Sequence, residues 1–157
     1  MNRQRKFEII CVVALIIFIA FVSADTAYSN KTAEEVAEGV VQSFDVNDLV
    51  KVKKNRIKEE FGMDLTTVDS CVYYASESVM NVSELMIIKL KEDVNADEIM
   101  NIISVRLDKK QTLFEGYAPE QSALLKDAVL KQSRGFVFYC VGEEAHEAFA
   151  SFRSNVR

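Results

Sequence analysis

The sequence contains few of the residues from which most catalytic and metal sites are built. It has one histidine, His146, no tryptophan, one proline, and five glycines that are scattered singly along the chain. A His-Glu-x-x-His zinc site needs a second histidine one helical turn after the first, and position 150 is alanine. There is no Gly-x-Ser-x-Gly elbow to present a serine nucleophile, and no glycine-rich loop to bind phosphate. We therefore expect no catalytic residue, no metal ligand and no cofactor.

Cysteine is also scarce, and acidic residues outnumber basic ones by 24 to 19. The three cysteines are too few for a disulfide scaffold, and Cys11 lies in an apolar N-terminal run. Cys71 and Cys140 fall in strand-like segments, where a lone cysteine usually serves as a small buried apolar residue; a bridge between them is the alternative. The whole chain carries a net charge of −5 and residues 1–24 carry +2, so the rest carries −7. This acidic balance argues against nucleic-acid binding.

The N-terminus has the pattern of an export signal or membrane anchor. Three basic residues, Arg3, Arg5 and Lys6, precede an uninterrupted apolar run at residues 9–22. Because positive charge stays on the cytoplasmic side, we expect a cytoplasmic N-terminus and an extracytoplasmic region from residue 25 to residue 157. Two outcomes remain open. The leader is cleaved after Ala24 and the protein is secreted, or a longer segment of roughly 17 to 25 residues is retained as a transmembrane helix.

These signals divide the chain into three parts. Residues 1–24 form the signal peptide or anchor, residues 25–31 a short polar tether, and residues 32–157 one extracytoplasmic domain. About 130 residues suffice for one hydrophobic core and are too few for two comfortable ones.

The first half of the domain is expected to contain two helices and a strand pair. Thr32 and Glu35 have the spacing of a capping box that begins a helix. A second helix is predicted over residues 47–61, ending at Gly62, and it carries five basic side chains. Residues 68–75 and 85–90 are rich in β-branched and aromatic residues, which predicts an antiparallel hairpin.

The second half repeats this alternation. Asn95 is expected to cap a long helix over residues 95–116, whose apolar stripe includes Ile103, with Lys109 and Lys110 on the opposite face. Pro119 suits the first turn of a short helix to about residue 125. Strands at residues 128–132 and 136–141 flank a tight turn at 133–135, and a last helix covers residues 143–154. Two hairpins separated by a long helix predict an α+β, two-layer domain with a four-stranded antiparallel sheet covered by helices on one face.

Several short motifs occur in a fixed order along this domain: EFGMD at 60–64, YYAS at 73–76, SELMIIK at 83–89, VRL at 105–107 with Gln111, FEGY at 114–117, PEQ at 119–121 and GFV at 135–137. Their order, over roughly residues 30–155, resembles an uncharacterised bacterial family, domain-of-unknown-function family 4358. The resemblance implies an export signal or membrane anchor, often lipid-modified, followed by one such domain, and it implies no activity. This chain departs from that pattern because Cys11 lies too early for lipid attachment.

Three polar side chains on or beside the stripe of the long helix, Arg106, Gln111 and Tyr117, are the remaining candidates for a site. They either bind an anionic ligand in a recess or, as we prefer, pack and cap the edge of the sheet. The sequence thus predicts a non-enzymatic binding or accessory module of the bacterial cell envelope, held at the membrane by its N-terminal segment, with an envelope protein or polymer as its partner. The alternative is a small envelope hydrolase that uses two carboxylates about 5 to 10 Å apart.

Overall fold

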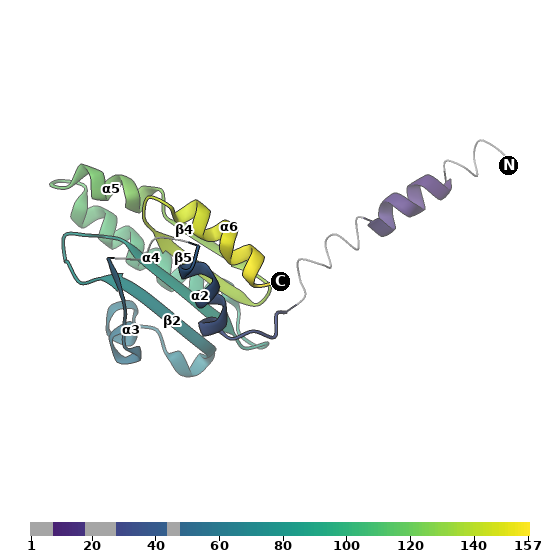
Figure 1. The fold of residues 1–157 in the computed structure, drawn as a ribbon, viewed down its shortest axis with the longest axis horizontal. Coiled ribbons are helices and arrows are strands. Elements are labelled where there is room, and N and C mark those ends of the chain that lie inside the picture. The colour runs from purple at the N-terminus through teal and green to yellow at the C-terminus, as the bar shows by residue number, and fades with distance from the viewer. Residues whose placement is uncertain (1–7, 18–27, 44–47) are drawn as a thin grey trace.

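A computed structural model describes residues 8–17, 28–43 and 48–157 (Figure 1). Beyond a helical segment at residues 8–17, the chain alternates helices with the strands of one sheet. In chain order the elements are α2 (Ala33–Val41), β1 (Leu49–Lys51), α3 (Lys54–Phe61), the 3-10 turn η1 (Leu65–Thr67), β2 (Val68–Ser76), β3 (Glu84–Leu90), α4 (Ala96–Phe114), α5 (Pro119–Lys126), β4 (Val129–Ser133), β5 (Phe136–Val141) and α6 (Ala145–Asn155).

The sheet is antiparallel and has five strands in the order β1-β2-β3-β5-β4. Both predicted hairpins, β2–β3 and β4–β5, are present, and they join through the pairing of β3 with β5. The α+β class is therefore confirmed, whereas the predicted number of four strands is wrong because β1 adds a fifth strand at the edge.

The fifth strand arises within residues that we predicted to be helical. Residue 47 lies outside the described residues, and of residues 48–61 only Lys54–Phe61 forms a helix. Leu49–Lys51 pairs with the end of β2, and the Val52 amide donates to the Tyr73 carbonyl at 2.8 Å. Val50 and Val52 lie on either side of Lys51 at the strand period of two, and β-branched side chains of this kind fit a pleated strand well. The neighbouring edge of β2 thus outweighed the weak helical signal.

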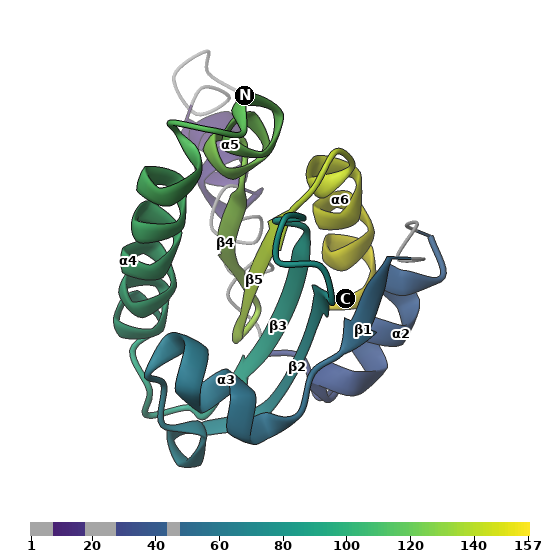
Figure 2. The ribbon, with the colours of Figure 1, turned by 90° about the vertical axis from the view of Figure 1, so that its left-hand side faces the viewer.

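Helices cover both faces of the sheet, so the predicted two-layer arrangement is also wrong. Figure 2 shows α3 and α4 on one side of the strands and α2 and α6 on the other. We call these the α4 face and the α2 face. The cause lies in β3 and β5, in which nearly every residue is buried: a strand that is apolar at successive positions has two faces to cover.

Several local predictions are confirmed. Thr32 and Glu35 form the reciprocal capping box, and the Asn95 side chain accepts from the Asp97 amide at the start of α4. Gly62 ends α3 at a φ of 66°. In the turn between β4 and β5, both Arg134 (φ 51°) and Gly135 (φ 81°) have positive φ, as a tight hairpin turn requires.

The predicted leader is described only in part. Residues 8–17 are helical and their side chains are exposed. Ala24, the predicted cleavage position, and residues 25–27 of the tether lie outside the described residues. Within the described part of the chain, no helix has both the length and the apolar character needed to cross a membrane.

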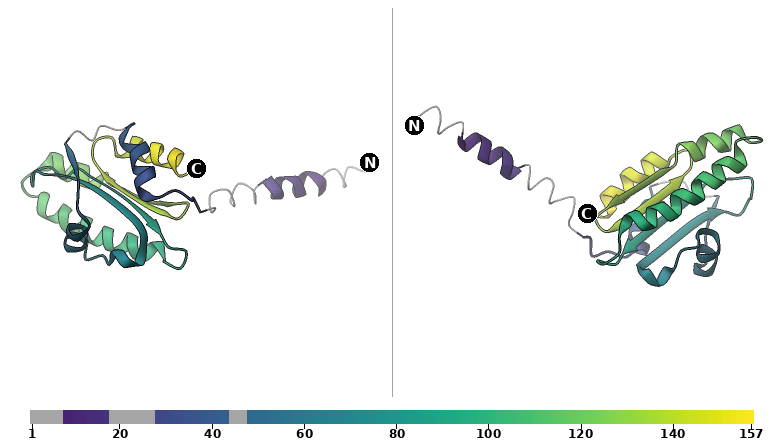
Figure 3. Two further views of the ribbon diagram at one scale, coloured as in Figure 1. Left: turned by 60° about the horizontal axis from the view of Figure 1, so that its bottom comes forward. Right: turned by 180° about the vertical axis from the view of Figure 1, so that it is seen from behind.

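The domain has two distinct ends. Ser29 donates its amide to the Arg134 carbonyl of the β4–β5 turn at 3.1 Å, and the C-terminus lies at the same end of the sheet (Figure 1). We call this the tether end. The loop between β2 and β3, residues 77–83, lies at the other end of β3, which we call the distal end; both panels of Figure 3 show the long axis that separates them. With seven residues at about 3.3 Å each, β3 alone separates the two ends by roughly 20 Å.

Cys71 and Cys140 are free and buried on opposite faces of the sheet, Cys71 on the α4 face and Cys140 on the α2 face. Burial raises the pKa of each thiol to about 12. Because the thiolate is the nucleophile, we expect iodoacetamide at pH 8 to leave both unmodified in the folded chain and to modify both after unfolding. Mass spectrometry of the alkylated peptides checks this, and modification of either cysteine under native conditions would contradict the assigned burial.

Candidate functional site

The most unusual polar residue of the described chain is Glu84, the first residue of β3. Its side chain is fully buried, and by strand alternation it shares the α4 face with Met86 and Ile88. A buried carboxylate is costly unless hydrogen bonds and opposite charge compensate it. Its surroundings therefore decide what it does.

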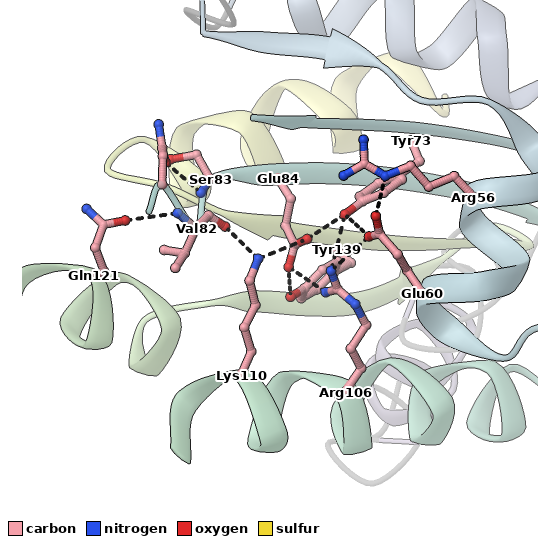
Figure 4. Close-up of polar contacts among 11 residues, drawn as sticks. Arg56, Glu60, Tyr73, Val82, Ser83, Glu84, Arg106, Lys110, Gln121 and Tyr139 are labelled. Carbon is pink, nitrogen blue, oxygen red and sulfur yellow. Dashed lines mark hydrogen bonds and ion pairs between the residues drawn. The ribbon is translucent and has the colours of Figure 1, made fainter. Parts of the chain in front are cut away.

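Four side chains contact the two oxygens of Glu84 (Figure 4). Oε1 accepts from the Tyr139 hydroxyl at 2.6 Å and from Nη1 of Arg106 at 2.8 Å. Oε2 accepts from the Tyr73 hydroxyl at 2.7 Å and lies 3.3 Å from Nζ of Lys110. Each oxygen thus has two partners, which satisfies the carboxylate within the protein. We call Glu84 and these four partners the Glu84 cluster.

A second carboxylate extends the cluster toward the surface. Oε2 of Glu60, from α3, lies 3.2 Å from Nη2 of Arg106 and 3.2 Å from the Tyr73 hydroxyl. Tyr73 has a single hydroxyl proton, so it donates to one carboxylate at a time, and Glu84 is the nearer. The guanidinium of Arg106 also stacks 4.1 Å over the Phe61 ring, while Arg56 pairs with Glu60 from the outer side. The cluster therefore links α3 and α4 to three strands.

The electrostatics follow from burial and from these partners. Burial acts to raise the pKa of Glu84, but the charges of Arg106 and Lys110 and the hydrogen bonds from Arg106 and Tyr139 outweigh it, so the pKa is lowered. Burial, together with the Glu84 charge, raises the pKa of both tyrosines, which stay protonated donors. Burial lowers the pKa of Lys110, and repulsion from Arg106 adds to this, although Glu84 opposes it.

The helical period of α4 directs both Arg106 and Lys110 toward Glu84. Ile99, Ile103, Arg106 and Lys110 follow one another at intervals of four, three and four residues, which places them on one face of α4. The prediction that Lys110 lies on the opposite face is therefore wrong, since its long side chain reaches inward with only 22% of its surface exposed. Lys109 is exposed, as predicted.

Of the three predicted polar candidates, the structure brings only Arg106 into the cluster. Gln111 donates its side-chain amide to the Leu125 carbonyl at 2.9 Å and so ties α5 to α4. Tyr117 is 59% exposed, and its ring lies 5.3 Å from that of Phe114 at a tilt of 32°. The contacts of Glu84 come from other side chains than these two.

Sequence reasoning missed Glu84 itself. The available signal was strand alternation, because Glu84 is the one acidic residue on a strand face otherwise formed by Met86, Ile88 and Leu90. Tyr73 and Tyr139 are the register partners of Met86 on the two neighbouring strands, so they flank this face on both sides. A charge at the start of such a face, with tyrosines beside it, indicates a buried polar cluster.

Chemically, Glu84 and the neighbouring Glu60 supply two carboxylates, as a hydrolase would require, but Glu84 has no surface through which to meet a substrate. Its four partners leave no lone pair directed at solvent. In the described residues, no three His, Cys, Asp or Glu side chains gather in a way that would hold a metal ion. The arrangement is suited to fixing α4 on the sheet.

The cluster also orders the distal end. Lys110 lies 3.3 Å from the Val82 carbonyl, and the Val82 amide donates to Oε1 of Gln121 on α5 at 2.9 Å. The loop that leads into β3 is therefore held by two helices (Figure 4). This connects the buried charges to the position of the exposed residues of the loop.

Comparison with known proteins places the chain in a family. No curated protein and no solved structure matches the chain. The family model described as domain of unknown function (DUF4358) matches residues 42–142, a span that includes the complete Glu84 cluster. The chain belongs to the DUF4358 family, as the order of its motifs indicated.

Proposed function

We propose that this protein is a non-enzymatic binding or accessory domain of the bacterial cell envelope, exported or membrane-tethered through its N-terminal segment. The observation that carries the proposal is the internal saturation of the Glu84 cluster. Both oxygens of the Glu84 carboxylate contact side chains within the protein and so stabilise the fold. We therefore infer that the protein acts through its exposed surface, by contacting partners.

The N-terminal pattern supports the location. Three basic residues before an apolar run of fourteen residues form an export signature, and the described domain begins beside the β4–β5 turn. The distal end then projects away from the membrane. Its exposed apolar side chains include Val79, 88% exposed, and Met80, 55% exposed. These two neighbouring side chains are accessible to a partner at that end.

The location is tested by adding protease to spheroplasts that produce the full chain. We expect the domain to be digested while a cytoplasmic marker protein stays intact, because residues 25–157 lie outside. Chemical cross-linking of intact membranes, followed by purification of the chain, should then recover an envelope protein or polymer. Protection of the domain in sealed spheroplasts would reject the proposal, and rupture of the spheroplasts provides the matched control for protease access.

A further inference from the structure

The edge strand β1 at the distal end has unpaired backbone groups. The Val52 amide donates toward β2, and backbone direction alternates along a strand, so the N–H and C=O groups of Val50 face β2 and those of Leu49 and Lys51 face outward. β1 ends the strand order. No described residue forms a hydrogen bond with the outward N–H and C=O groups of Leu49 and Lys51. An open edge of this kind is a template for another strand.

A groove lies beside this edge. It is lined by Val50 of β1, by the residue that precedes this strand, and by the end of β2 and the β2–β3 loop: Asp48, Val50, Ser76, Glu77, Ser78 and Asn81. Asp48 and Val50 are two positions apart and so project to the same side of the strand. A segment added to β1 would place alternate side chains in the groove, one opposite Val50 and the next opposite Asp48.

The charge of the groove selects among partners. Asp48 and Glu77 are exposed, and no cation of the described residues pairs with either. Val50, 39% exposed, is the apolar residue of the groove lining. The complementary segment has an apolar residue opposite Val50 and a lysine or arginine opposite Asp48, two residues further along an antiparallel strand.

A second copy of the chain fits this edge less well. Antiparallel pairing of two β1 edges requires a twofold axis perpendicular to the strands. That axis would turn the tether ends of the two copies to opposite poles. Two chains anchored in one membrane need their tether ends on the same side, so the edge favours a segment from another protein.

We propose that β1 and its groove bind an extended segment of a partner protein by antiparallel strand addition, with an apolar residue and a basic residue two positions apart in the segment. This inference rests on the proposed binding function and specifies which side chains the partner segment must carry. The main-chain bonds supply affinity, and the two groove side chains supply selectivity.

The probe is a fluorescent peptide of about ten residues, capped at both ends, that alternates valine and serine and carries one lysine two residues after its central valine. Anisotropy with the full chain in detergent micelles should show saturable binding that empty micelles do not. Asp48→Lys combined with Glu77→Lys should weaken Kd by about tenfold or more, because like charges then face each other. A peptide with glutamate in place of the lysine should bind this double variant again.

Two controls separate strand addition from general charge attraction. Glu92→Lys combined with Asp93→Lys makes the same charge change at the tether end, where both residues are exposed, and should leave Kd unchanged. N-methylation of the peptide amides that face β1 should abolish binding. Equal weakening in both double variants, binding of the N-methylated peptide, or no binding by the parent chain would overturn the site. Self-association that the Asp48 and Glu77 changes abolish would assign the edge to a second copy and also overturn it.

The two proposals fail in different experiments. A chain that is exported and cross-linked to a partner but does not bind the peptide would reject only the strand-addition site. A chain protected from external protease would reject the envelope location, whatever the peptide does.

Discussion

Glu84→Ala should reduce the free energy of unfolding by about 3 to 5 kcal/mol, because in a largely buried setting it leaves Lys110 without its carboxylate and Arg106 with only the partly exposed Glu60. The tyrosine hydroxyls that contact Glu84 also lose their acceptor. Urea unfolding of the full chain in micelles, followed by circular dichroism, measures the change. In a domain of ordinary stability, about 5 to 15 kcal/mol, this loss is a large fraction of the total.

Glu60→Ala is the matched control, since it removes a carboxylate that also contacts Arg106 but is 24% exposed. We expect it to cost under about 1 kcal/mol. A second variant replaces the whole cluster: Glu84→Leu, Arg106→Met, Lys110→Met, Tyr73→Phe and Tyr139→Phe should recover much of the stability lost in Glu84→Ala, because no buried polar group is then left alone. Parent-like unfolding of Glu84→Ala would show that the cluster does not hold the fold.

Acid unfolding gives an independent measurement of the same group. The pKa of Glu84 is lowered in the folded state from its ordinary 4.5, so the folded protein binds fewer protons than the unfolded chain near that pH. The stabilising contribution is fully present above pH 4.5 and is lost as the pH falls through the folded-state value. Between pH 7 and pH 3 the parent should lose more stability than Glu84→Ala, which lacks the group.

Ile103→Ala should reduce the free energy of unfolding by about 2 to 5 kcal/mol. Ile103 is fully buried at the centre of α4 and packs into the cluster of apolar side chains between this helix and the sheet. Removing three carbons there leaves a cavity that a helix held by Arg106 and Lys110 on the same face cannot easily close. Thermal and urea unfolding measure the change.

The two neighbouring lysines give the matched comparison on the same helix. Lys109→Glu, on the exposed side, should change stability by less than about 0.5 kcal/mol. Lys110→Glu should cost about 1 to 3 kcal/mol, because it places a second carboxylate beside Glu84 and removes one of its cations. Equal effects of the two reversals would show that Lys110 does not reach the cluster.

Much of the secondary structure is encoded by signals within a few residues of each other. The Thr32 capping box, the Asn95 cap, the positive φ at Gly62 and the turn at Arg134 and Gly135 depend on local backbone geometry, so their positions are predictable from the sequence. The coverage of both faces of the sheet was also encoded, in the unbroken apolar run of β5, but the order of two hairpins and a long helix suggested helices on one face only.

The sequence by itself determined the α+β class, the two hairpins, the long helix and the family of this protein. Only the tertiary structure decided that residues 49–51 form a strand, because the edge of β2 offered hydrogen bonds that outweighed a weak local preference. It alone brought together Tyr73, Glu84, Arg106, Lys110 and Tyr139, which come from three strands and a helix. The partners of a buried charge are set by strand register and helix packing, and these depend on contacts between residues far apart in the chain.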